Sequence, residues 1–123
     1  SYLIQSNKDF FVSSILMTKP NFITQKKIKS KILDLRQNKK IQKELKNKII
    51  LIENADPGYD WIFSHKISGL ITKFGGVNSH MSIRCEEKQI PAIIGVGDEL
   101  FESIKKEKIL EIDCKLQKIN LLN

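Results

Sequence analysis

The chain has 123 residues, of which 41% are hydrophobic and 28% are charged, a composition typical of one soluble globular domain. It contains no apolar run of about 18 residues and no N-terminal signal pattern, so we expect no membrane span, no membrane partner and a cytoplasmic location. The 21 Lys and Arg residues exceed the 14 Asp and Glu residues, which gives a net charge of +7. Because no aromatic residues are interleaved with the lysines, we expect no nucleic-acid partner.

The first twenty residues mix short apolar runs with polar breaks and end at Lys19-Pro20. This pattern predicts a linker from an upstream domain at residues 1–20 and a globular domain at residues 21–123. Because the chain begins with Ser1 rather than Met, we expect it to be a segment of a longer polypeptide.

From Pro20 onward, segments with strand and helix patterns alternate. We expect strands at Ile28–Ile32, Ile49–Ile52, Gly69–Thr72, Pro91–Gly95, Ile109–Ile112 and Lys118–Leu121. We expect helices at Lys39–Lys46, Tyr59–His65, Ser79–Lys88 and Asp98–Lys105. Asp56 is suited to cap the second of these helices, with Pro57 in its first position. The alternation predicts an α/β fold with crossover connections between parallel strands.

The segment from Ile71 to Arg84 contains the residues that are best suited to take part in a reaction. A strand ends at the turn Gly75-Gly76, the hydroxyl of Ser79 follows, and His80 stands in the first turn of the next helix. Free amides and the positive end of the helix dipole favour a phosphate group there. Imidazole is available as a neutral nucleophile near neutral pH, so we interpret His80 as a phosphoryl acceptor.

Arg84 follows His80 by four residues, which puts both side chains on one face of the helix. No acidic residue lies three or four positions before Arg84, so we expect it to support the phosphoryl group rather than the fold.

Other chemically capable residues have simpler interpretations. His65 is expected to end its helix as a structural residue. Cys85 is expected to be a small buried side chain, and Cys85 and Cys114 lack the spacing of a metal site, so we expect reduced thiols and no bound metal. The aromatic residues of Tyr59-Asp60-Trp61 are more often core than substrate contacts, and this segment is left outside the predicted site.

The motif Gly75-Gly76, two further residues and Ser79-His80, followed by a helix and then Ile90-Pro91-Ala92-Ile93-Ile94-Gly95, resembles a known family. It is the phosphohistidine (swivelling, mobile) domain of the phosphoenolpyruvate-utilising enzymes, which include pyruvate phosphate dikinase. The resemblance covers roughly residues 22–122 and implies a single α/β domain with β/β/α layers. It also implies that His80 accepts the phosphoryl group, with Ser79, Gly75 and Gly76 supporting it.

The chain departs from the usual pattern of the family at two positions. Most members carry arginine six residues after the histidine and glycine three residues later, where this chain has Glu86 and Gln89. The arginine here is Arg84, which leaves open which side chain neutralises the phosphoryl group.

A narrower similarity links Glu53–Phe63, Asn78–Met81 and Ile83–Cys85 to the glutamine-kinase subgroup of this family. The resemblance to the wider family implies that ATP and magnesium are bound by an upstream ATP-grasp domain of the same polypeptide, that this domain binds no cofactor itself, and that His80 takes the β-phosphoryl group as in the dikinase-like members. The narrower similarity implies that His80 delivers the group to a small acceptor, the side-chain amide of L-glutamine, in the phosphoramidate modification of capsular polysaccharide.

Gly95-Val96-Gly97 lacks the lysine and spacing of a phosphate-binding loop, so we expect no ATP binding and no turnover by this chain alone. Two alternatives stay open. In the first, the domain is the carrier of another enzyme, one that resembles phosphoenolpyruvate synthase, pyruvate phosphate dikinase or an antibiotic kinase. In the second, it is a non-catalytic binding module in which His80 is a core residue.

Overall fold

The computed structural model describes residues 3–6, 20–35 and 44–121 of the chain. The strands are β1 (Leu3–Ser6), β2 (Asn21–Ile23), β3 (Lys27–Asp34), β4 (Ile49–Asn54), β5 (Gly69–Phe74), β6 (Ala92–Ile94), β7 (Ile109–Asp113) and β8 (Lys118–Leu121). The helices are the 3₁₀ helix η3 (Pro57–His65) and the α-helices α1 (His80–Glu87) and α2 (Asp98–Ile104).

The strands form one mixed sheet in the order β1-β8-β7-β3-β4-β5-β6-β2. The central strands β3, β4, β5 and β6 run parallel to one another, while β7 pairs antiparallel with both β3 and β8. This confirms the predicted α/β fold, because β4, η3, β5, α1 and β6 follow one another as strand, helix, strand, helix and strand.

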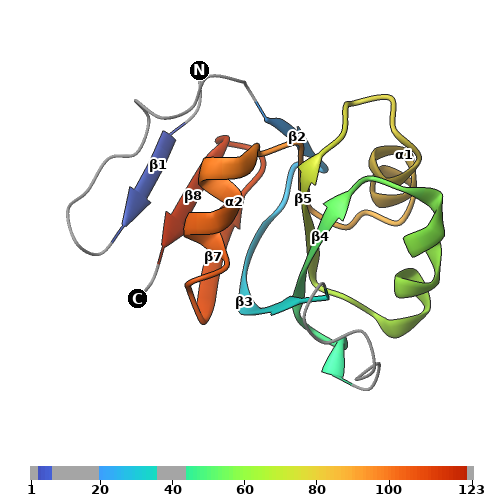
Figure 1. Ribbon diagram of the computed structural model, residues 1–123, viewed down its shortest axis with the longest axis horizontal. Coiled ribbons are helices and arrows are strands. Elements are labelled where there is room, and N and C mark those ends of the chain that lie inside the picture. Colours follow the sequence, from blue (N-terminus) through green and yellow to red (C-terminus); the bar gives the residue numbers. More distant parts are fainter. Residues whose placement is uncertain (1–2, 7–19, 36–43, 122–123) are drawn as a thin grey trace.

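Strand β4 explains how the domain is layered. All four side chains of Ile49, Ile50, Leu51 and Ile52 are buried, as expected for a parallel strand that is covered on both faces. Ile49 and Leu51 pack into a cluster with α2, β7 and β8, whereas Ile50 and Ile52 pack into a second cluster with η3 and α1. The central strands therefore lie between a layer of strands with α2 and a layer of helices, as Figure 1 shows.

The structure also contains strands that the sequence analysis did not predict. Strand β2 pairs antiparallel with β6, and β1, inside the segment expected to be a linker, pairs parallel with β8. Both are short, at three and four residues, so neither has room for a clear two-residue alternation. Residues 39–43 of the predicted Lys39–Lys46 helix lie outside the described residues.

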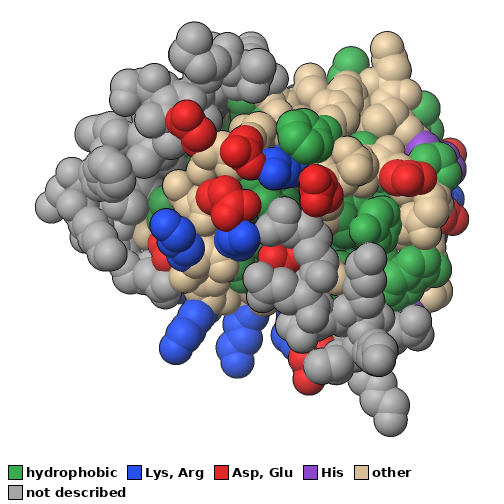
Figure 2. All heavy atoms as spheres, in the orientation of Figure 1, with side chains coloured by type: hydrophobic (Ala, Val, Ile, Leu, Met, Phe, Trp, Pro, Cys, Tyr) green, Lys and Arg blue, Asp and Glu red, His purple; other side chains and the backbone are tan. Residues whose placement is uncertain are grey.

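No helix in the described ranges is long and apolar enough to cross a membrane. On the face drawn in Figure 2, acidic and basic side chains are interspersed, and several long Lys or Arg side chains project from one edge.

Candidate functional site

The predicted site lies where two neighbouring parallel strands end. Asn54 and Phe74, the last residues of β4 and β5, are register partners, and Ala55 N donates to Phe74 O at 3.1 Å. The chain leaves β4 into η3 and leaves β5 into the turn before α1. Because carboxyl ends of parallel strands share one edge of the sheet, the first turns of η3 and α1 come together there (Figure 1).

The two glycines of the turn have different roles. Gly75 has φ +135°, and a Cβ there would lie 2.6 Å from Ala55 Cβ and 3.1 Å from Ile94 Cγ2. Gly75 is therefore required for the turn to pack against the end of β4. At Gly76 a Cβ would meet nothing within 4 Å, so packing does not require glycine there.

Ser79 is the N-cap of α1, as its place before His80 predicts. Its Oγ accepts from Ser82 N at 3.3 Å and lies 2.9 Å from Ser82 Oγ. Ser82 is buried, and its hydroxyl donates to Gly76 O at 2.8 Å. Since the Ser82 proton is used in that bond, the Ser79 hydroxyl donates to Ser82 Oγ, while its oxygen accepts the capping bond from Ser82 N. The sequence analysis missed Ser82, although a hydroxyl three residues after an N-cap is a usual signal of such a network.

His80 is the first residue of α1, and its side chain is 41% exposed. Its Nε2 lies 2.8 Å from Asp60 Oδ1, and Arg84 Nε donates to the same Oδ1 at 2.9 Å. The structure therefore brings the predicted pair His80 and Arg84 together on one carboxylate from η3.

Asp60 was also left out of the site predicted from the sequence. The hydrogen bond with His80, and next the bond from Arg84, hold the pKa of the Asp60 carboxyl below its ordinary value. Asp60 is therefore an anion at neutral pH. Asp60 could have been found from the strand order. Strands β4 and β5 were both predicted, and residues that follow adjacent parallel strands meet at one edge of the sheet. The aromatic neighbours Tyr59 and Trp61 had instead suggested a core position.

Arg84 has one acidic partner on another element, Asp60, and a second one, Glu87, three residues later on its own helix. Besides Asp60, its Nη1 lies 3.9 Å from Glu87 Oε1, and its guanidinium lies 5.3 Å from the centre of the Phe63 ring. In a 3₁₀ helix residues i and i+3 eclipse each other, so Asp60 and Phe63 both face Arg84. These contacts tie α1 to η3, and the expectation that Arg84 supports the phosphoryl group stays a prediction.

The remaining candidates have mixed outcomes. His65 ends η3, as predicted, and its ring meets Trp61 edge to face at 5.8 Å. Trp61 is 37% exposed, so the expectation of a core position is wrong for it, while Tyr59 packs against the buried cluster beside η3. Cys85 is fully buried, as predicted, and burial raises the pKa of its thiol to about 12.

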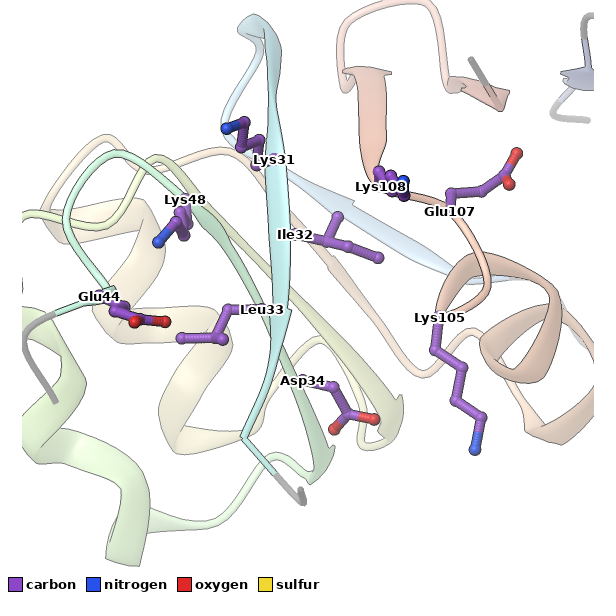
Figure 3. Close-up of a pocket in the computed structure, with 9 residues that line it drawn as sticks. All are labelled: Lys31, Ile32, Leu33, Asp34, Glu44, Lys48, Lys105, Glu107 and Lys108. Carbon is purple, nitrogen blue, oxygen red and sulfur yellow. The ribbon is translucent and has the colours of Figure 1, made fainter. Parts of the chain in front are cut away.

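Two cavities lie away from the His80 side chain. One, of about 420 Å³, borders the turn through Gly75 and is lined by both partners of an ion pair, Lys73 Nζ and Asp98 Oδ1, which are 2.6 Å apart. The other, of about 410 Å³, is lined by charged side chains of both signs from β3, the segment before β4 and the end of α2, among them Lys31, Glu44 and Lys105 (Figure 3). Within the described ranges, no group of three or more His, Cys, Asp or Glu residues is arranged to hold a metal ion.

Fold and site together define a small α/β domain that presents one half-exposed histidine at the start of a helix, backed by a carboxylate and an arginine. The family model for the mobile domain of phosphoenolpyruvate-utilising enzymes matches residues 44–116, and the chain belongs to this family. Mobile domains of this family normally sit within multidomain proteins. No curated protein matches the chain at significant similarity.

Proposed function

We propose that the domain is a phosphohistidine carrier and that His80 is its carrier residue. The observation that supports this most directly is the position of His80: it begins α1, its side chain is 41% exposed, and it is held by a bond to Asp60 rather than buried. A carrier histidine has to reach a donor and then an acceptor. An exposed imidazole on a fixed helix meets that need, whereas a core histidine does not.

The transfer divides one reaction between separated reactants into two in-line displacements. In the first, an imidazole nitrogen attacks the β-phosphorus of ATP, and the N–P bond forms as the P–O bond to the departing AMP breaks. Water then removes the γ-phosphoryl group as inorganic phosphate, which leaves one phosphoryl group on His80. In the second, the acceptor attacks the same phosphorus and the N–P bond breaks. ATP and magnesium belong in this scheme to an upstream ATP-grasp domain of the same polypeptide.

For the acceptor we propose the side-chain amide of L-glutamine, on the sequence similarity of Glu53–Phe63 and of the segment around His80 to the glutamine-kinase subgroup. The amide nitrogen attacks phosphorus, releases one proton, and becomes a phosphoramidate as His80 is regenerated. An amide is a poor nucleophile, so its reaction gains from a reactive phosphohistidine donor. A carrier in a dikinase-like or antibiotic-phosphorylating enzyme uses the same His80 chemistry with another acceptor.

The carrier role is tested with the multidomain enzyme and ATP labelled in its phosphoryl groups. We expect an acid-labile, base-stable label that is lost in His80→Asn and retained in His65→Asn. His65 is the matched control because it is the other of the two histidines in the chain. Label retained in His80→Asn would contradict the assignment.

The acceptor is tested separately by phosphorus NMR of the same enzyme with ATP, magnesium and L-glutamine. We expect a new phosphoramidate resonance together with AMP and inorganic phosphate. Phosphoenolpyruvate formed from pyruvate, with no product from glutamine, would refute the glutamine proposal and leave the carrier role intact.

A further inference from the structure

We propose that the cavity between the loops that follow β5 and β6 binds a free α-amino acid as its zwitterion, with the ligand carboxylate on Lys73 and the ligand ammonium on Asp98. The inference does not depend on the carrier function, because it concerns a cavity away from the His80 side chain. It assigns a role to a pair of charged residues that the proposed phosphoryl transfer does not use.

The first step concerns the place of the cavity in the sheet. Strands β5 and β6 are parallel neighbours, but the helices that follow them cover opposite faces (Figure 1). Helix α1 packs into the cluster with Ile50 and Ile52, whereas α2 packs into the cluster with Ile49 and Leu51. Where the connections of adjacent parallel strands leave to opposite faces, a crevice forms at the carboxyl ends of the strands, and ligands of α/β proteins bind there. The cavity of about 420 Å³ lies at this point, because residues of both loops line it.

The second step is that the two walls of the cavity are joined to each other. Gly95 N donates to Thr72 Oγ1 at 3.0 Å, and Gly97 N donates to Lys73 O at 2.9 Å. Gly95 has φ +78°, and a Cβ there would collide with Gly75 O, so the two loops touch backbone to backbone. The cavity is therefore preformed, and its volume is typical of small-molecule sites, which span about 300–1,000 Å³.

The third step concerns the groups that line the cavity. Lys73 Nζ lies 2.6 Å from Asp98 Oδ1, and the two side chains are 13% and 70% exposed. The ammonium is thus held in the wall of the cavity, whereas the carboxylate lies mostly in solvent at the start of α2. Lys73 Nζ also lies 5.3 Å from the centre of the Phe74 ring, and Phe74 is 47% exposed. The cavity therefore offers one cation, one anion and one apolar ring close together.

The fourth step is the charge pattern that these groups select. An anion that binds Lys73 brings its charge against the Asp98 carboxylate, and a cation that binds Asp98 meets the Lys73 ammonium in the same way. A zwitterion placed between the two side chains replaces one ion pair with two and joins unlike charges at both contacts. An α-amino acid carries its ammonium and carboxylate on neighbouring atoms, which suits this short separation. Its side chain then lies beside the Phe74 ring, which favours an apolar side chain.

The experiment is a titration of the full ¹⁵N-labelled chain with L-leucine, followed through the backbone amide signals by NMR. We expect saturable shifts at residues 73–75 and 95–98. Two smaller compounds divide the ligand: 4-methylpentanoate lacks the ammonium, and 3-methylbutylamine lacks the carboxylate. We expect each to bind at least roughly tenfold more weakly than L-leucine, as for the loss of one charge-assisted hydrogen bond. The absence of saturable shifts with L-leucine, or equal affinity for either smaller compound, would overturn the proposal.

Variants test the two charged residues separately. Lys73→Met and Asp98→Asn each remove one charge from the cavity, and we expect each to weaken L-leucine binding by roughly tenfold or more. Lys105→Met is the matched control, since Lys105 forms an ion pair with Glu102 at 2.8 Å and does not line this cavity. Unchanged affinity in either cavity variant, or an equal loss in Lys105→Met, would also overturn the proposal. The comparison of the three compounds on the wild-type chain decides it even if a variant fails to fold.

Discussion

The two glycines of the turn before His80 offer a matched pair of substitutions with opposite expected results. In Gly75→Ala, the new Cβ lies at φ +135°, 2.6 Å from Ala55 Cβ and 3.1 Å from Ile94 Cγ2. Ala55 cannot retreat easily, because its N–H is bonded to Phe74 O at 3.1 Å. In Gly76→Ala, the new Cβ meets nothing within 4 Å.

The magnitudes follow from these contacts. An unfavourable backbone conformation costs about 1–3 kcal/mol, and overpacking costs a similar amount, so Gly75→Ala should lower the free energy of unfolding by at least about 2 kcal/mol. Gly76→Ala should change it by no more than about 0.5 kcal/mol. Urea unfolding followed by circular dichroism measures both, and the midpoint is the quantity to compare at equal m value.

The same pair also tests the predicted contact between the turn and the phosphoryl group. If the group approaches the backbone at Gly76, a methyl group there should slow phosphorylation of His80 in a domain of unchanged stability. Phosphorylation at the wild-type rate would remove Gly76 from the site. A Gly75→Ala domain as stable as the wild type would refute the packing argument itself.

Three further predictions concern charge and burial. Carbon NMR titration should give Asp60 a pKa below 3.8, and His80→Asn should raise it, since the bond with His80 is the main cause of the shift. Because a lowered carboxyl pKa stabilises the fold above the unfolded pKa, the stability difference between wild type and Asp60→Asn should vanish as pH falls through the lowered value. Arg84→Ala should slow phosphorylation by roughly 10² to 10³, while Arg84→Lys should restore only part of the rate because it lacks the Nε donor; equal rates in all three would contradict a role in the site. Burial raises the pKa of both Cys85 and Cys114 to about 12, so a thiol reagent should label the native domain no faster than it unfolds, and rapid labelling would refute their burial.

Much of the fold was predictable because local pattern and tertiary position agree. The run Ile49–Ile52 is buried on both faces, and the predicted helix at Ser79–Lys88 corresponds to α1 with both flanking residues as caps. The helix expected at Tyr59–His65 is present with Asp56 as its cap, but it is a 3₁₀ helix. Hydrophobic spacing over so few residues cannot distinguish a period of 3.0 from one of 3.6.

The candidate site was predictable only along one segment of the chain. His80 and Arg84 are four residues apart and share a helix face, so the sequence alone joins them. Asp60 is 20 residues before His80, and only the pairing of β4 with β5 brings the two together. The contact of Arg84 with Asp60 was not predictable for the same reason, since this carboxylate comes from another element.

The burial of the residues around His80 and the exposure of its ring help to decide between a carrier domain and a non-catalytic binding module. Met81, Ser82 and Cys85, which follow His80 on α1, are buried, and the turn before it is fixed by Ser82 Oγ donating to Gly76 O at 2.8 Å. The imidazole itself is 41% exposed. A structural histidine gains most from burial of its ring, whereas here the burial lies in the residues behind it. An exposed nucleophile on a fixed support reduces the entropy lost when a phosphoryl donor is aligned with it, which favours the proposed carrier role over a purely structural one.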